Sequence, residues 1–241
     1  MKLQLTKGKY TTCIAQSSAD MDACFALRSV CFGPAGGNSD QFDAAATHVL
    51  VLDTASGQAV ASYRMTVLDS QAVEASYSAQ FYDLTSLMSF EGQMLELGRF
   101  CIHPDQPDPD IPRIAWATLT GFVDENAVGM LFGCSSFRGT APAIYRDAFG
   151  LLKERYLAPA SLRPARRHSE RFDFGAENLG KVDLKSAQAQ LPPLLRTYLM
   201  MGGWVSDHAV VDHVMNTLHV FTGLEIARIP PARKKLLRAL V

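Results

Sequence analysis

The sequence predicts an α/β fold in which a mixed central sheet is covered by helices on both faces. Two observations lead to this class. Apolar segments with the period of a strand and segments with the period of a helix follow one another along most of the 241 residues. Two neighbouring strands are separated only by the turn residues Ser56–Gly57, which predicts an antiparallel hairpin and therefore a sheet that is not purely parallel.

The first third of the chain supplies a strand, a helix and a loop. The strand is expected over Tyr10–Gln16, and Ser17 then opens a helix in which Asp20 completes a capping box. Gly33–Pro34 ends this helix, because proline cannot continue it. The residues up to Asp43 are rich in glycine, asparagine and aspartate, which is typical of a loop.

The middle of the chain holds the centre of the predicted sheet. Thr47–Asp53 and Ala59–Leu68 are the two strands of the hairpin, and Met94–Ile102 alternates apolar and polar residues as a further strand. We expect a helix over Phe81–Phe90. His103–Pro112 is an acidic, proline-rich loop.

The second half begins with a helix from Pro112 to about Ala127, a strand over Gly129–Ser135 and a helix from about Thr140 to Glu154. The later pattern predicts a helix over Pro192–Met201, a strand over Thr217–Phe221 and a helix after Pro231. Because no segment has the composition of a linker, we expect one domain over residues 1–241. Its core would span about residues 10–155, and residues 156–241 would form a C-terminal extension.

Composition excludes several classes of protein. A net charge of −1 argues against a general nucleic-acid binder, which normally has an excess of basic residues. The five cysteines show no C-x-x-C spacing and no cluster with histidine, so we expect no metal site. The first ten residues contain no apolar signal region, and no apolar run is long enough to span a bilayer. The sequence therefore predicts a cytoplasmic protein.

Several short motifs resemble one family. Leu95–Arg99 (LELGR) precedes a strand, Gly133–Phe137 (GCSSF) is followed by Gly139–Thr140, and Leu191–Leu194 reads LPPL. Together with Asp43, these motifs resemble the bacterial ornithine–acyl-carrier-protein N-acyltransferases of amino-acid lipid biosynthesis. The resemblance extends over most of the chain and implies a GNAT-like fold. A more distant likeness, through an arginine on the first helix and a Glu-x-x-Arg on the strand, connects the chain with acyl-homoserine-lactone synthases.

The resemblance implies an enzyme that moves a 3-hydroxyacyl group from acyl-carrier protein to the α-amine of ornithine, giving lyso-ornithine lipid. Three alternatives stay open. Glutamine is an alternative acceptor for the same reaction. The chain is alternatively an acyl-homoserine-lactone synthase, or a non-catalytic module that binds acyl lipids. The implied partners are acyl-carrier protein and the amino acid, and no cofactor is needed because the acyl-phosphopantetheine is itself a substrate.

Acyl transfer needs a base for the amine and donors for the oxyanion, and the candidates are Glu96, Gly98 and Tyr145. Glu96 lies inside an apolar strand, where a surface carboxylate is not expected, and it can remove a proton from the amine. Gly98 marks a bulge whose backbone N–H groups would bind the oxyanion. Tyr145, on the helix after a later strand, is a candidate acid for the leaving thiolate, although packing on the surface of an amphipathic helix is the simpler explanation.

Charged residues are candidates for holding the amino acid. Arg99, Arg64 and Arg28 are candidates for its carboxylate, which an arginine binds through two parallel hydrogen bonds. Asp43 and Asp212 are candidates for the ornithine ammonium. Arg99 and Glu96 would face opposite sides of a regular strand, so a bulge at Gly98 is required to bring them to a common face.

Coenzyme-A-dependent relatives bind a pyrophosphate with a glycine-rich loop at this place in the chain. Here the loop from His103 has no glycine and carries three aspartates. This favours a carrier-protein donor, whose single phosphate Arg113 is a candidate to meet. Arg163, Arg166 and Arg167 are candidates for docking the acidic carrier protein. The tail, Ala232–Val241, is basic and apolar, and peripheral contact with the inner membrane is an open possibility for it.

Overall fold

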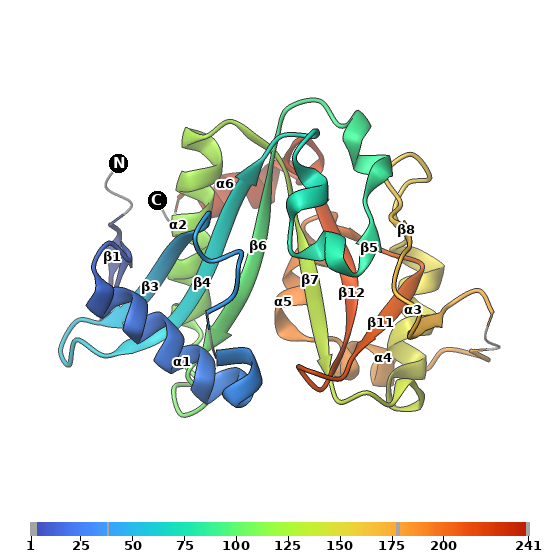
Figure 1. The fold of residues 1–241 in the computed structure, drawn as a ribbon, viewed down its shortest axis with the longest axis horizontal. Coiled ribbons are helices and arrows are strands. Elements are labelled where there is room, and N and C mark those ends of the chain that lie inside the picture. Colours follow the sequence, from blue (N-terminus) through green and yellow to red (C-terminus); the bar gives the residue numbers. More distant parts are fainter. Residues whose placement is uncertain (1–3, 38, 177–178, 240–241) are drawn as a thin grey trace. The chain divides into compact units, whose positions relative to one another are not determined.

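The computed structural model describes residues 4–37, 39–176 and 179–239. The chain divides into two compact units (Figure 1). The first unit combines the segment up to Val67 with Leu95–Val128 and the segment from Pro230. The second unit combines Leu68–Met94 with Gly129–Ile229. The expected single domain stays a prediction.

The first unit is built on a sheet of the order β1-β2-β3-β4-β6. Its strands are β1 (Thr6–Lys7), β2 (Tyr10–Ile14), β3 (Thr47–Asp53), β4 (Ala59–Leu68) and β6 (Gln93–Ile102). The pairs from β1 to β4 are antiparallel. The turn between β3 and β4 contains Gly57 at φ 71°, a backbone conformation that favours glycine, so the hairpin predicted from Ser56–Gly57 is confirmed.

Helices cover both faces of this sheet (Figure 1). The hydroxyl of Tyr63 on β4 donates to the carbonyl oxygen of Ala115 in α2 (Asp110–Glu125), 3.2 Å away. Helix α1 (Ser18–Gly37) covers the other face, and it is interrupted at Gly33, whose φ is 74°. At its start the N–H of Asp20 donates to the Ser17 hydroxyl while Asp20 accepts from the Ser17 N–H, which confirms the capping box.

The short helix α6 (Pro231–Arg238) packs against α2 in the first unit. The guanidinium of Arg238 makes two hydrogen bonds, of 2.8 and 2.9 Å, to the carboxylate of Asp124. The predicted helix after Pro231 is therefore confirmed, whereas Leu240 and Val241 of the predicted membrane-contacting tail lie outside the described residues.

The second unit has an antiparallel sheet of the order β7-β12-β11-β9, with β10 also paired to β12. The strands are β7 (Val128–Arg138), β9 (Arg171–Asp173), β10 (Trp204–Val205), β11 (His208–Asp212) and β12 (Thr217–Glu225). One face packs on α3 (Arg146–Arg155), α4 (Leu184–Gln190) and α5 (Pro193–Met200). Phe137, Phe149 and Val220 lie in this core.

The opposite face is covered by irregular chain. This segment contains three 3-10 helices, Val73–Ala75, Ser78–Gln80 and Thr85–Ser89, and the strand β5 (Tyr82–Asp83), which pairs with β8 (Ala165–Arg166). Tyr82 packs with Phe132 and Phe221 of the sheet in a second apolar cluster, which also holds Val73, Ala79, Leu84, Leu87, Met94, Met130, Ala158, Trp204 and Val210.

Two sequence expectations differ from the structure. Phe81–Phe90 is not an α-helix, because Asp83 accepts hydrogen bonds from the N–H and hydroxyl of Thr85, which favours a turn. The expected helix from Thr140 to Glu154 is divided into a 3-10 turn, Pro142–Tyr145, and α3. The α/β class itself, with helices on both faces, is confirmed. Among the described residues, no helix is long and apolar enough to cross a membrane.

Candidate active site

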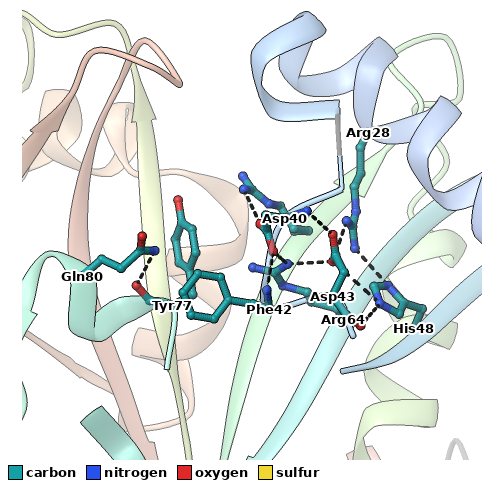
Figure 2. Close-up of polar contacts among 9 residues, drawn as sticks. Arg28, Asp40, Phe42, Asp43, His48, Arg64, Tyr77 and Gln80 are labelled. Atoms are coloured by element: carbon teal, nitrogen blue, oxygen red, sulfur yellow. Dashed lines mark hydrogen bonds and ion pairs between the residues drawn. The ribbon is translucent and has the colours of Figure 1, made fainter. Parts of the chain in front are cut away.

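A network of charged side chains lies on the α1 face of the first unit (Figure 2). Asp43 is its centre: one carboxylate oxygen accepts from Arg28 at 2.8 Å and from Arg64 at 2.7 Å, and the other accepts from the N–H of Asp40 at 2.8 Å. The Asp40 carboxylate in turn bridges Arg64, at 2.5 Å, and Arg99, at 2.9 Å. Two carboxylates are thus shared among three guanidinium groups.

The side chains of this network range from fully buried to partly exposed. The side chain of Arg28 is fully buried, and those of Arg64 and Asp43 are 3% and 5% exposed. Arg99 is 13% exposed and Asp40 is 23% exposed. Of the three arginines, Arg99 is therefore the most accessible to a small substrate, while Arg28 and Arg64 support the site from inside.

Electrostatics keep the two aspartates charged. Burial on its own would raise the pKa of Asp43, but the hydrogen bond from the Asp40 N–H and the guanidiniums of Arg64 and Arg28 outweigh it and lower the pKa to about 2. The pKa of Asp40 is lowered as well, because Arg64 and Arg99 outweigh the effect of its burial.

His48 on β3 completes the buried part of the network. Because a guanidinium can only donate, Nδ1 of His48 must accept from Arg28, at 3.0 Å, and Nε2 carries the proton that it donates to the carbonyl oxygen of Asp43, at 3.0 Å. Burial and the nearby Arg28 lower the pKa of His48, which agrees with this neutral form.

Strand β6 is irregular where the candidate catalytic residues lie. Arg99 has a φ of 52°, a left-handed conformation that is unusual for a residue with a side chain. Gly98 lies against Arg64, since a Cβ at this position would be 3.2 Å from Nε of Arg64. Strand alternation puts Glu96, which is 5% exposed, on the same face as Gly98. The ion pair with Asp40 joins Arg99 to Arg64 on that face, and the bulge expected at Gly98 stays a prediction.

Two further candidates, Asp212 and Tyr145, belong to the second unit. A carboxylate oxygen of Asp212 accepts from the N–H of Met215 at 2.9 Å, which closes the turn between β11 and β12. Tyr145 packs on Phe137 and donates its hydroxyl proton to the carbonyl oxygen of Arg138 at 2.7 Å. These contacts are the structural roles that the sequence also allowed, and the roles in substrate binding and catalysis stay predictions.

The candidate basic residues for carrier-protein docking are held by acidic groups or carbonyls. In the second unit, Arg166 pairs with Asp173 at 2.6 Å and Arg167 with Glu74 at 2.6 Å, while Arg163 donates to the carbonyl oxygen of Ala158. In the first unit, Arg113 is 65% exposed and pairs with Asp110. These ion pairs reduce the positive potential that each arginine offers to an acidic partner.

The loop before α2 retains its acidic character in the folded chain. Asp108 accepts from Lys9 at 2.9 Å and from the hydroxyl of Tyr10 at 3.0 Å. The N–H of Asp110 and Lys9 lower the pKa of Asp108 to about 2, so this carboxylate is charged at neutral pH. Its ion pair with Lys9, and that of Asp110 with Arg113, reduce the negative potential at this helix start as other ion pairs reduce the positive potential of the arginines.

The sequence reasoning missed a second group of buried polar residues, in the second unit. His208 and His219 are fully or almost fully buried beside Tyr82. Their signal was available, because His219 stands within the apolar segment Thr217–Phe221 as Glu96 stands within its own strand.

Comparison with known proteins identifies the class. Residues 33–117 match the family described as acetyltransferase (GNAT) domain. The solved structure of FeeM, an N-acyl amino acid synthase from uncultured soil microbes, is similar in fold, with a TM-score of 0.52 and 9% identity over 92% of this chain and 93% of that one. The fold is therefore that of the GNAT class.

Curated relatives narrow the class to a family. The L-ornithine N(alpha)-acyltransferase of Rhodobacter capsulatus is 34% identical over 76% of this chain and 72% of its own length. The enzyme of the same name from Brucella abortus is 30% identical over 80% of this chain and 71% of its own. The chain belongs to the L-ornithine Nα-acyltransferase family and is an amino-acid N-acyltransferase.

Proposed function

We propose that the protein transfers a 3-hydroxyacyl group from acyl-carrier protein to the α-amine of ornithine and so makes lyso-ornithine lipid. The observation that carries the proposal is the 34% identity with a relative named for Nα-acylation of L-ornithine, over 72% of that relative's length. The loop before α2 supports a carrier-protein donor, because it has no glycine and carries three aspartates where coenzyme-A-dependent members of the GNAT class hold a pyrophosphate.

Glu96 is the proposed general base. The α-amine of an amino acid is largely protonated at neutral pH, and only its neutral form attacks a thioester. A carboxylate that is buried in β6 and lies on the face of the Asp43 network can take this proton, directly or through one water. The neutral amine then attacks the thioester carbonyl carbon, the C–S bond breaks as the amide C–N bond forms, and the second amine proton goes to the leaving carrier-protein thiolate.

The irregular turn of β6 supplies the proposed oxyanion site. When the amine attacks, negative charge develops on the thioester oxygen, and backbone N–H groups that leave the regular ladder can donate to it. The left-handed Arg99, next to Gly98, is where β6 departs from regular geometry. Such donors are each worth about 3 kcal/mol in other acyl-transfer enzymes.

Arg99 is the proposed partner of the substrate carboxylate, because it is more exposed than Arg28 or Arg64. Asp40 orients its guanidinium, and Asp43 holds Arg64 and Arg28 behind it. In this arrangement Asp43 is a positioning residue rather than the acceptor of the ornithine ammonium, since its carboxylate already accepts three hydrogen bonds.

The test is an acyl-transfer assay with purified protein, 3-hydroxypalmitoyl carrier protein, and ornithine and glutamine offered side by side. Product masses report which amide forms. Acylated ornithine as the main product supports the proposal, and acylated glutamine assigns the same chemistry to the other acceptor. Replacing the donor with 3-hydroxypalmitoyl coenzyme A tests the carrier. No amide from folded protein with any combination would overturn the proposed reaction.

A further inference from the structure

Two cysteines, one on α1 and one on β6, meet on the α1 face of the first unit. The ring of Phe100 stacks on Tyr63, whose hydroxyl reaches α2, so Phe100 lies on the α2 face of β6. Side chains alternate along a strand, which puts Cys101 on the opposite face, towards α1. From α1, Sγ of Cys31 donates to the carbonyl oxygen of Ile102 at 3.3 Å. The two thiols are therefore neighbours, and they hydrogen-bond to each other.

The two thiols differ in access and in acidity. Cys31 is partly exposed, whereas Cys101 is buried. The hydrogen bond from Cys101 lowers the pKa of the Cys31 thiol and outweighs the effect of its partial burial. The same hydrogen bond, together with burial, raises the pKa of Cys101. Because the thiolate is the form that reacts with oxidants, Cys31 is the reactive thiol, and Cys101 is placed to react with its oxidised form.

The first unit has two other cysteines, Cys13 and Cys24, and their surroundings differ. Cys24 is fully buried and Cys13 is partly buried. Burial is the main influence on both, and it raises the pKa of each thiol. The lowered pKa therefore distinguishes Cys31 from these two thiols, and Cys13 is a matched control for it.

The cysteine pair borders the charged network. Cys31 follows Arg28 by three residues on α1, which is about one turn, and Cys101 follows Arg99 by two residues on β6. A disulfide holds its two Cα atoms about 4.4–6.8 Å apart. A bond between Cys31 and Cys101 would therefore fix α1 against β6 beside both arginines and constrain how the network positions them.

We propose that Cys31 and Cys101 are a redox modification site, at which a peroxide forms a disulfide that links α1 to β6 and slows acyl transfer. The effect on acyl transfer rests on the proposed function. The Cys31 thiolate attacks a peroxide oxygen, so that an S–O bond forms and the O–O bond breaks, and the leaving hydroxide takes up the proton that Cys31 lost. The sulfur of Cys101 then attacks the sulfur of Cys31. The S–S bond forms, the S–O bond breaks, and the proton of Cys101 leaves with the hydroxyl as water, so the thiols are oxidised and hydrogen peroxide is reduced to water.

The experiment treats reduced protein with hydrogen peroxide, blocks the remaining thiols and maps disulfides by peptide mass. We expect the Cys31–Cys101 link in wild type and in Cys13→Ser, and we expect Cys31→Ser to lack it. Cys101→Ala should stop at the sulfenic acid of Cys31, which dimedone labels. In the acyl-transfer assay, oxidised wild type should lose about tenfold or more in kcat and recover with dithiothreitol, because small displacements in a site cost rate. Cys31→Ser should retain its rate through the same treatment.

Two results would overturn the proposal. One is a pair that stays reduced under peroxide, or that forms disulfides with other cysteines instead. The other is a linked protein that transfers acyl groups as fast as the reduced protein. Failure of the proposed function looks different, since reduced wild type would then acylate neither amino acid. The disulfide mapping needs no turnover, so it tests the cysteine pair in that case too.

Discussion

Replacing Asp43 with asparagine tests whether the buried network holds the first unit together. The change keeps the size of the side chain and removes its charge, while Arg28 stays fully buried with Nη1 2.8 Å from the former carboxylate. The lowering of the Asp43 pKa from 3.8 to about 2 corresponds to about 2 kcal/mol in favour of the folded, charged form. Breaking a buried ion pair on one side typically costs about 3–5 kcal/mol.

We therefore expect Asp43→Asn to lower the free energy of unfolding by about 3 kcal/mol at pH 7. The assay is urea denaturation followed by the fluorescence of Trp116, which lies in α2 of the first unit, in a Trp204→Phe background that removes the signal of the second unit. Asp22→Asn is the matched control, because Asp22 is an exposed carboxylate on α1 of the same unit.

The pH dependence of the free energy of unfolding provides a second test of this reasoning. A carboxylate with a lowered pKa stabilises the folded chain above its unfolded pKa of about 4, and this contribution disappears as the pH falls towards 2. The difference between wild type and Asp43→Asn should therefore shrink from pH 4 to pH 2. A loss no larger than that of Asp22→Asn, or a difference that does not change with pH, would refute the reasoning.

Four further changes test the site and its surroundings. Glu96→Gln should lower kcat about 100-fold or more in the acyl-transfer assay while circular dichroism shows an unchanged fold, and near-normal turnover would exclude Glu96 as the base. Gly98→Ala, whose Cβ would approach Nε of Arg64 to 3.2 Å, should reduce activity by displacing Arg64, whereas Gly57→Ala in the distant hairpin turn should affect stability only. Joint replacement of Arg163, Arg166 and Arg167 by alanine should raise KM for the carrier protein in a salt-dependent way, and an unchanged KM would remove this surface from the docking hypothesis. Burial lowers the pKa of His219 to about 3, so below the unfolded pKa of about 6.5 the unfolded chain binds a proton that the folded ring does not, and stability falls as the pH falls; His219→Phe should therefore flatten the stability curve between pH 6 and 4 by up to about 1.4 kcal/mol per pH unit, in urea denaturation followed by Trp204 of the second unit in a Trp116→Phe background.

Local sequence patterns predicted the hairpin strands of the first unit correctly. The strand bounds Thr47–Asp53 and Ala59–Leu68 agree with the structure, because a period of two and a strong turn are local signals. The helix predicted over Phe81–Phe90 was wrong. Leu84 and Leu87 are spaced as on a helix and both are buried, although Leu87 lies in a 3-10 turn, Leu84 lies directly before it, and Tyr82 belongs to a short strand. Packing against other parts of the second unit determines the structure of this segment, and that packing cannot be inferred from the segment's own residues.

The arrangement of the candidate site residues could likewise not be predicted from local sequence patterns. The sequence offered Arg28, Asp43 and Arg64 through a family resemblance, but it gave no sign that two aspartates would be divided among three arginines. Ion pairs of the basic stretch reach far along the chain, as between Arg167 and Glu74, so the charge of a cluster that looks like a docking surface in sequence is partly neutralised in the structure. Charge patterns alone therefore overstate docking surfaces.

Polar residues inside apolar strands were the most informative signal of all. Burying a carboxylate or an imidazole without full compensation opposes folding, so a stable chain retains such a residue only where it is balanced or used. Glu96 on β6 and His219 on β12 are two such residues, one in each unit, and both are almost fully buried. Near Glu96, β6 also adopts the left-handed conformation at Arg99, which costs about 1–3 kcal/mol. Backbone strain next to a buried charge opposes stability twice at one place, which supports the proposal that this part of β6 serves the acyl transfer.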